Sequence, residues 1–370
     1  MIYLDNNATT ALDSRVFERV LPLLSGPPAN PSSIHRYGQK AKALLAQATK
    51  EIASFFDVSG EELIFTSGAT EALNMLINGL GSRGHVITSS LEHVAVLQPM
   101  QRLEKKGISV TYLDPLPNCG SISPRQIEEA LRPDTSLIAL MAANNETGII
   151  SDIEAIASLA EEVGVALVVD GVAFLGKAPL ILPKGVSAIC FTGHKIYGPL
   201  GAGLAVVRKK VKFEPLIVGG PQQQGRRGGT ENLPGIVGLS HALSLFSYEE
   251  ISRIKKLRDY FEKCVMDTID NVTILGQKES RICNTSSVIF QGVDGETLLM
   301  TLDLAGVAVS HGSACSSGGL EPSRVLLNMG LSREAARSSI RFSLGRYTTQ
   351  EELDQALSIL VESVTRLRAR

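Results

Sequence analysis

The chain has few cysteines and no excess of charge of either sign. Its 370 residues include five cysteines, and no two of them form a CxxC pair. An odd number of scattered cysteines does not suit a disulfide framework or a structural zinc site. The 36 basic residues nearly balance the 38 acidic ones. The composition therefore predicts neither a nucleic-acid-binding surface nor an acidic disordered tail.

Long apolar runs and targeting signals are also absent from the sequence. The apolar runs are too short to span a bilayer. The first residues, MIYLDNNATT, lack the cationic start and apolar core of a signal peptide. No internal repeat or low-complexity segment interrupts the chain. We therefore expect a cytoplasmic protein with reduced thiols and with no membrane or nucleic-acid partner.

Short apolar runs alternate with helical patterns between about residues 60 and 210. The predicted strands are residues 62–66, 85–89, 108–113, 136–143, 165–170, 187–192 and 203–208. They are almost continuously apolar, as is typical of strands that are buried on both faces of a sheet. Amphipathic stretches such as residues 153–164 lie between most of them. This alternation predicts an α/β fold with a mostly parallel seven-stranded sheet and helices on both faces.

The pattern changes after a glycine-rich stretch at residues 219–229. The C-terminal part mixes strand-like and helical segments, which predicts a smaller α+β domain. These segments are residues 286–291, 295–306, 338–344 and 351–369. We predict a large domain over residues 15–255. Residues 1–14 and 256–370 would form the small domain.

Ligands of such sheets bind beyond the carboxyl ends of the strands, so the residues that follow each strand are informative. Small residues in SGATEALN (67–74) open a helix whose backbone N–H groups suit a phosphate, although an ordinary capped glycine turn fits them equally well. His93 and Asn145 follow two other predicted strands. Each of these two residues also fits a purely structural role.

Asp170 and Lys195 are more informative because each follows a buried strand directly. A carboxylate at the rim of a buried sheet is costly unless it is paired, so Asp170 is either a helix cap or the partner of a buried cation. Partial burial of Lys195, beside His194, would lower its pKa and suit a Schiff-base nucleophile. Together with the phosphate cradle and His93, these residues predict a pyridoxal 5'-phosphate (PLP) site.

Cys315 lies in the segment SHGSACSSGG (310–319), among residues too small to bury its sulfur. A structural cysteine usually packs in a core as a small hydrophobic residue. The thiol of Cys315 therefore needs another explanation.

The order of short motifs along nearly the whole chain resembles the NifS/IscS-type cysteine desulfurases. The motifs are YLDNNATT, NPSSIHRYG, FTSGATEALN, EHVAV, NNETG, TGHKIYGP, RRGGTEN, GSACSS with LEPS, and IRFSLGR. The resemblance implies a fold-type I PLP-dependent transferase that acts as a homodimer. It also implies conversion of L-cysteine to L-alanine, with the sulfur left as a persulfide on an enzyme cysteine. A sulfur acceptor or iron–sulfur scaffold protein would then take the sulfur for cluster assembly or other sulfur biosynthesis.

The resemblance also implies roles for single residues of the PLP site. Lys195 would bind the cofactor as a Schiff base, His93 would stack on the ring and assist proton transfers, and Asp170 would keep the ring nitrogen protonated. Asn145 and Arg341 would orient the substrate and the cofactor, and Arg341 would bind the substrate carboxylate through two hydrogen bonds. The implied phosphate ligands are Ala69, Thr70, Thr192, His194 and, from the neighbouring subunit, Thr230.

Cys315 would be the nucleophile that takes the sulfur. A loop of small residues, at about 310–322, can move between the substrate and an external acceptor, whereas a packed segment cannot. No resident metal is expected, and Cys315 is the one residue expected to serve as a transient iron–sulfur ligand. IscS-type members continue past the last predicted helix with a tail used for scaffold docking, so the sequence does not identify the acceptor.

Two positions depart from the family pattern. The family usually has the pattern DAxQxxGK, whose glutamine donates to the phenolic oxygen of PLP, where this chain has DGVAFLGK with Ala173 at the glutamine position. Loss of a hydrogen bond to a charged oxygen costs roughly 1.5–3 kcal/mol, unless water or another side chain fills the gap. His311 replaces a small residue, and it either favours the Cys315 thiolate or faces solvent. Two alternative functions remain. One is a selenocysteine lyase, and the other is a weakened homologue that acts as a binding or regulatory partner.

Overall fold

The computed structural model describes residues 1–28, 30–116, 119–312 and 321–369. Its largest feature is a seven-stranded sheet in the order β2-β8-β7-β6-β5-β3-β4. The strands in this order are β2 (Leu63–Thr66), β8 (Gly203–Val207), β7 (Ala188–Thr192), β6 (Ala166–Asp170), β5 (Thr135–Met141), β3 (His85–Ser89) and β4 (Ser109–Leu113). Only β8 runs antiparallel to its neighbours. All seven predicted strands are present in this sheet, and the predicted fold class is confirmed.

Helices cover both faces of the large sheet, because its strands carry apolar side chains on both sides. One face packs against α1 (Ser14–Ser25), α2 (Arg36–Phe56), α5 (Pro124–Ala130), α6 (Ile153–Val163) and α7 (Leu233–Ser244). The other face packs against α3 (Ala69–Leu80) and α4 (Val94–Glu104). Successive side chains of β7 point to opposite faces of the sheet. Phe191 packs in the core on the first face, and Cys190 packs in the core on the other face.

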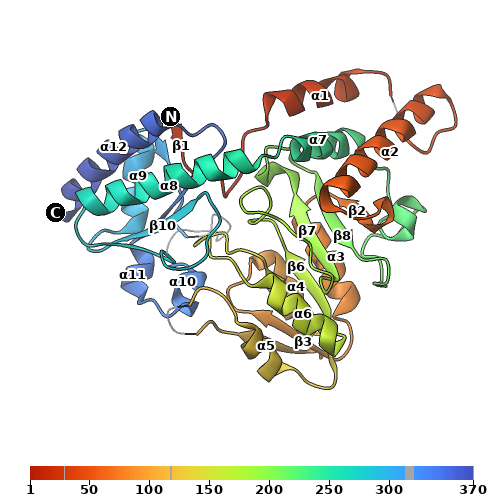
Figure 1. Cartoon of the computed structure of the whole chain (residues 1–370), viewed down its shortest axis with the longest axis horizontal. Helices are drawn as coiled ribbons and strands as arrows, with labels where there is room; N and C mark the ends of the chain where they lie inside the picture. The colour runs from red at the N-terminus through yellow and green to blue at the C-terminus, as the bar shows by residue number, and fades with distance from the viewer. Residues whose placement is uncertain (29, 117–118, 313–320, 370) are drawn as a thin grey trace.

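A second unit is formed by the C-terminal residues and the first residues of the chain (Figure 1). Its antiparallel sheet has the order β12-β10-β9, and a short parallel pair joins β1 to β11. The strands are β1 (Ile2–Tyr3), β9 (Val272–Ile274), β10 (Thr285–Phe290), β11 (Val307–Ala308) and β12 (Ser339–Ser343). The helices are α8 (Tyr248–Thr268), α9 (Gly295–Leu304), α10 (Arg324–Asn328), α11 (Arg333–Arg337) and α12 (Gln350–Arg368). The predicted boundary between residues 255 and 256 falls inside α8, and the domain limits stay a prediction.

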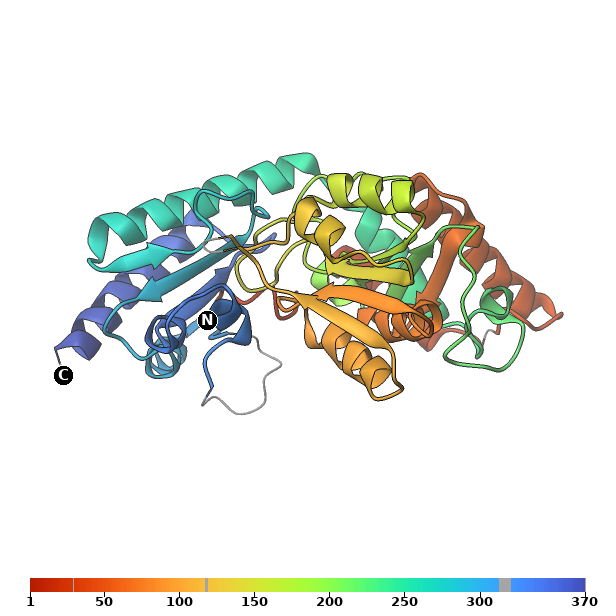
Figure 2. The ribbon, with the colours of Figure 1, turned by 90° about the horizontal axis from the view of Figure 1, so that it is seen from below.

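The N-terminal segment connects the two units. After β1, residues 5–13 pass from the smaller sheets to the large one (Figure 2). The backbone N–H of Asn6 donates to Ser343 of β12 at 3.1 Å, and the N–H of Thr10 donates to the carbonyl of His194, next to β7, at 2.9 Å. This crossing positions N-terminal carbonyl groups at the end of the large sheet. Among the described residues, no helix combines the length and apolar character that crossing a membrane requires.

Candidate functional site

A cavity of about 440 Å³ opens at the carboxyl ends of β5, β6 and β7. Nine of the predicted site residues line it together, namely Ala69, Thr70, His93, Asn145, Asp170, Thr192, His194, Lys195 and Arg341. They come from the large sheet, from its helices and from β12 of the second unit. Sequence reasoning therefore placed these residues in one site, although the roles assigned to them stay predictions.

The N-terminus of α3 forms one wall of this cavity. Its N-cap residue, Gly68, has no side chain, and no side-chain hydrogen bond caps the helix. A Cβ atom on Gly203 would lie 2.4 Å from Cα of Gly68, so β8 passes against this turn only because residue 203 is glycine. The uncapped N–H groups and the positive end of the helix dipole suit a phosphate group.

Asp170 ends β6 at the floor of the cavity and is only 6% exposed. Its Oδ1 accepts a hydrogen bond from the backbone N–H of Val172 at 3.0 Å. Burial raises the pKa of Asp170, while that hydrogen bond and then the electrostatic effects of His93 and Lys195 act to lower it. A buried carboxylate that faces a cavity is stabilised by a cationic ligand such as a protonated ring nitrogen.

His93 is the N-cap of α4, where its Nδ1 accepts a hydrogen bond from the N–H of Ala95 at 3.1 Å. In the neutral ring this leaves the proton on Nε2. Burial lowers the pKa of His93, against the opposing effect of Asp170. The structure therefore presents a neutral imidazole with one available N–H at the cavity.

Lys195 ends η2 (Gly193–Lys195), the short helix that follows β7. Its Nζ donates hydrogen bonds to the backbone carbonyls of Asn7 and Ala8, the latter at 2.7 Å. The side chain of Asn7 is itself fixed, because its Nδ2 donates to Thr285 Oγ1 at 2.8 Å. The N-terminal segment thus holds the amine at the cavity.

His194, beside Lys195, lies 3.1 Å from the hydroxyl of Thr9 through its Nδ1. Burial, followed by the charges of Lys195 and Lys177, lowers the pKa of His194 to about 4. The ring is therefore neutral at pH 7, and it can offer an N–H to a phosphate without adding charge.

Arg341 reaches the cavity from β12 and is only 3% exposed. Its Nη2 pairs with Asp5 at 2.6 Å, and its Nη1 donates to the carbonyl of Asn145 at 3.0 Å. In the part of the chain that the structure describes, its buried Nε has no hydrogen-bond partner. A substrate carboxylate would have to share Arg341 with Asp5 or bind through Nε. The bidentate contact of Arg341 with the substrate carboxylate therefore stays a prediction.

Thr230 lies in a neighbouring hollow with Gln223 and Arg227 and does not line the main cavity. Its predicted contact belongs to another subunit, so it stays a prediction.

Cys315 and most of its predicted loop lie outside the described residues. His311, just before them, contacts the carbonyl of Ser339 through Nδ1 at 2.7 Å. A carbonyl only accepts hydrogen bonds, so Nδ1 of His311 carries a proton.

Sequence reasoning missed three residues around this cavity. It gave no role to Asn7 and Ala8, although both stand in the motif YLDNNATT and their carbonyls hold Lys195. It also gave no role to Lys177 at the end of DGVAFLGK, which lines the cavity with Ala173. The signal for Lys177 was a lysine within a buried apolar stretch. Among the described residues, no group of three or more histidine, cysteine or acidic side chains is placed to bind a metal.

Comparison with known proteins places this geometry in a family. Residues 2–356 match the class-V aminotransferases. The chain is 43% identical to "Cysteine desulfurase IscS" of Dictyoglomus turgidum, covering 99% of this chain and 95% of that protein. It is 41% identical to "Cysteine desulfurase 2" of Trichormus variabilis, covering 100% and 94% of the two chains.

Solved structures agree with the sequence relatives. A NifS-like protein superposes with a TM-score of 0.91 at 35% identity, covering 99% of this chain and all of the other. A structure described as SspA in complex with cysteine has a TM-score of 0.84 at 34% identity, covering 94% of this chain and all of the other. The chain therefore belongs to the class-V aminotransferases and, within them, to the NifS/IscS-type cysteine desulfurases that its motif order predicted.

Proposed function

We propose that this chain is a catalytically active desulfurase that converts L-cysteine to L-alanine and takes the sulfur onto Cys315. One observation carries the proposal: a single cavity combines the amine of Lys195, the buried carboxylate of Asp170, the neutral ring of His93 and the uncapped N-terminus of α3. A chain that served only as a binding partner would not require these four groups to converge.

The residues of the cavity fit PLP. The N-terminus of α3, with Thr70, Thr192 and His194, would hold the phosphate, and Asp170 would face the ring nitrogen. A volume of about 440 Å³ is within the range of small-ligand sites, roughly 300–1,000 Å³. When bound, PLP supplies an electron sink for the negative charge that develops on the amino-bearing carbon of the substrate.

The protein side chains would bind the substrate and move protons around this sink. Lys195, oriented by the carbonyls of Asn7 and Ala8, is placed to take and return a proton at the substrate carbon. His93 keeps its Nε2 proton toward the cavity because Nδ1 is occupied by Ala95. Arg341 would orient the substrate carboxylate.

The sulfur step balances without an external oxidant. The thiolate of Cys315 would attack the substrate sulfur, so that an S–S bond forms as the carbon–sulfur bond breaks. The electron pair of the broken bond stays with the carbon, which takes a proton and becomes the methyl group of alanine. The product on the enzyme is a persulfide of Cys315.

The described ends of the Cys315 segment support this assignment, because both lie near the cavity. Ser310 pairs with Arg341 through backbone hydrogen bonds of 2.7 and 3.1 Å. Ser323, on the other side, donates a hydrogen bond from Oγ to the carboxylate of Glu146. The segment between them therefore begins and ends beside residues that follow β5 or lie on β12.

The remaining assignments rest on the resemblance of the sequence motifs to the family and on the composition of the chain. We propose a homodimer in which Thr230 of one subunit reaches the phosphate of the other, and a cytoplasmic location. A sulfur-acceptor or iron–sulfur scaffold protein would take the persulfide sulfur, since relatives carry the name IscS.

The test is product formation by the purified, PLP-loaded protein. With L-cysteine and a thiol reductant we expect alanine and sulfide in equal amounts. A protein that is yellow but releases neither product would contradict the proposal and favour a binding or regulatory role. The same assay with L-selenocysteine separates a desulfurase from a selenocysteine lyase by comparing kcat/KM for the two substrates.

A further inference from the structure

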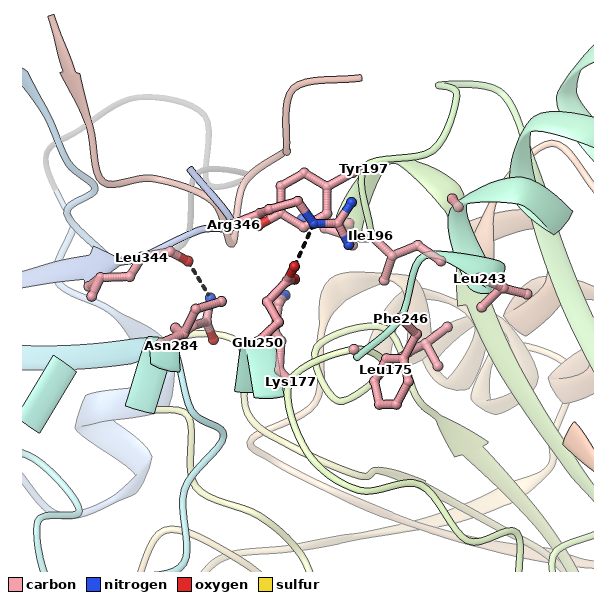
Figure 3. Close-up of a pocket in the computed structure, with 14 residues that line it drawn as sticks. Leu175, Lys177, Ile196, Tyr197, Leu243, Phe246, Glu250, Asn284, Leu344 and Arg346 are labelled. Carbon is pink, nitrogen blue, oxygen red and sulfur yellow. Dashed lines mark hydrogen bonds and ion pairs between the residues drawn. The ribbon is translucent and has the colours of Figure 1, made fainter. Parts of the chain in front are cut away.

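Lys177 is a buried lysine that the catalytic scheme above does not use. It lines the main cavity and also a smaller one of about 30 Å³, which Figure 3 shows together with Glu250, Asn284 and Arg346. The residue is only 7% exposed. Its Nζ has no hydrogen-bond partner among the described residues. A buried amine without a partner is costly, so it indicates a missing ligand group.

Among the described residues that line the two cavities, no carboxylate is left to pair with Lys177. In the described part of the chain, three carboxylates line the two cavities, and each has another role. Glu250 pairs with Arg346 at 2.7 Å, and Glu71 pairs with Arg227 at 2.8 Å. Asp170 interacts with His93 and Lys195. These described carboxylates are therefore committed elsewhere, and the anionic group of a bound molecule fits beside Lys177.

The charged neighbours of Lys177 restrict which part of a ligand it can meet. Burial, then the positive charges of Lys195 and Arg341, lower the pKa of Lys177 to about 7, while Cys283 acts to raise it. Lys177 in turn lowers the pKa of His194. The amine therefore lies within electrostatic range of the lysine that would bind the cofactor and of the arginine at the substrate end.

The chain path explains why this amine faces the cavity. Residues 171–176 form a turn after β6, in which the N–H of Leu175 donates to the carbonyl of Gly171 at 3.0 Å. Gly176 has φ 76°, which reverses the chain immediately before Lys177. Ala173 belongs to the same turn and also lines the cavity. The missing amide side chain at position 173 and the unpartnered amine thus belong to one wall.

We propose that Lys177 donates a hydrogen bond to the phenolic oxygen of PLP, which receives none from an amide at Ala173. The inference rests on the proposed function, because it requires PLP in the cavity. In PLP the phenolic oxygen is attached next to the carbon that binds Lys195 and on the opposite side of that carbon from the phosphate arm. With the phosphate at α3, this oxygen would be the anionic group of the cofactor nearest to Lys195, a residue that lines the same cavity as Lys177.

The test is a pH titration of the visible absorption band of the PLP-loaded protein. A cation beside the phenolic oxygen disfavours a proton on the nitrogen that links Lys195 to PLP, so it lowers the pKa of that nitrogen. In Lys177→Met we expect the midpoint to rise by about 1 pH unit or more. Adding Ala173→Gln to this variant should bring the midpoint back down. Lys184→Met, at an exposed lysine, is the matched control and should not move it.

A second variant keeps the test decisive if Lys177→Met folds poorly. In the parent, Ala173→Gln adds a donor to an oxygen that is already bonded, so the midpoint should shift by less than about 0.3 unit. If Ala173→Gln lowers the midpoint of the parent by about 1 pH unit or more, the phenolic oxygen lacked a donor, and the proposal is overturned. An unchanged midpoint in Lys177→Met with a raised KM for cysteine would instead assign Lys177 to the substrate carboxylate. A parent with no visible band would contradict the proposed function and not this inference.

Discussion

At the scale of single residues, the four cysteines that the structure describes differ in their environments. Cys190 on β7 and Cys283 before β10 are buried. Burial raises the pKa of Cys190 well above its ordinary value and that of Cys283 to about 11. Both thiols therefore stay protonated at neutral pH, and a protonated thiol is a poor nucleophile. Cys119 and Cys264 are partly exposed.

We expect Cys315→Ser to keep the visible colour of the PLP-loaded protein but to release almost no alanine, because no cofactor ligand is changed. Cys190→Ser and Cys283→Ser should keep most of the activity and lose some stability. The measurement is persulfide labelling after brief exposure to cysteine, followed by peptide mapping. A label on any cysteine other than Cys315, or near-parent turnover by Cys315→Ser, would show that Cys315 is not the nucleophile.

Glu92 allows a second prediction at this scale, which concerns how folding stability depends on pH. The residue is 1% exposed, and its Oε1 accepts a hydrogen bond from Ser89 at 2.8 Å. Burial raises the pKa of Glu92 to about 8. The folded protein therefore holds this proton more tightly than the unfolded chain, whose glutamate ionises near about pH 4.3. Stability is lost as the pH rises from there to about 8.

In Glu92→Gln this loss should disappear, because the amide does not ionise. We expect the difference in Tm between pH 5 and pH 8 to shrink by at least about 2 °C. Glu128→Gln, at an exposed glutamate of α5, is the control and should leave the difference as it is. An equal difference in parent and Glu92→Gln would mean that Glu92 is already ionised in the folded protein.

At the scale of elements, the sequence was sufficient where structure is local. Each strand of the large sheet was predictable because its own residues are apolar and are buried on both faces. Strand-end residues such as Asp170 were predictable because parallel strands bring their carboxyl ends to one edge. The hydrogen bonds from Lys195 to Asn7 and Ala8 span 188 and 187 residues. No local pattern encodes such contacts, since they depend on how the N-terminal segment crosses between the units.

Lys177 illustrates the same limit within one element. The sequence shows the missing amide at Ala173 and a lysine four positions later, but not which way the lysine points. That direction depends on the turn after β6 and on the positive φ of Gly176. A lysine pattern alone is more typical of a solvated surface.

Helix α3 allows a prediction in which helix stability and cofactor binding oppose each other. Gly68 is an extended N-cap, and a Cβ there would meet only Thr192 Oγ1 at 3.8 Å, which is ordinary contact. Gly68→Asp should stabilise the PLP-free protein by about 0.5 kcal/mol, because aspartate caps and complements the helix dipole. The same charge should weaken PLP binding at least about tenfold, because it repels the phosphate.

The measurements for this variant are thermal unfolding of the PLP-free protein and equilibrium titration with PLP. Gly68→Ser is the matched control, since it adds a cap without a charge, and it should weaken PLP binding much less. Equal affinities for PLP in Gly68→Asp and the parent would show that the phosphate is not held at this helix end.

At the scale of the whole molecule, a buried ionic network joins the N-terminal segment to the C-terminal unit. Asp13 is 0% exposed. Its Oδ2 accepts hydrogen bonds from Arg15 at 2.7 Å, Arg346 at 2.6 Å and Tyr347 at 2.9 Å. Arg346 also pairs with Glu250 at the start of α8. Because the N–H of Asp13 donates to the carbonyl of Tyr197, two residues after Lys195, the network is also tied to the turn that carries Lys195.

We expect Asp13→Asn to lower the free energy of unfolding at pH 7 by about 3 kcal/mol, since removing one partner leaves Arg346 buried with less compensation. Hydrogen bonds, first from Arg15 and then from Arg346 and Tyr347, hold the pKa of Asp13 well below its ordinary value. Its contribution is therefore present above about pH 4, where an unfolded aspartate is ionised, and is lost as the pH falls further. Urea unfolding at pH 7 and pH 3 should show the variant and the parent converging at the lower pH. Asp267→Asn, at an exposed position of α8, serves as the control. If the difference in free energy of unfolding between the parent and Asp13→Asn is the same at both pH values, the loss comes from packing and not from the charge of Asp13.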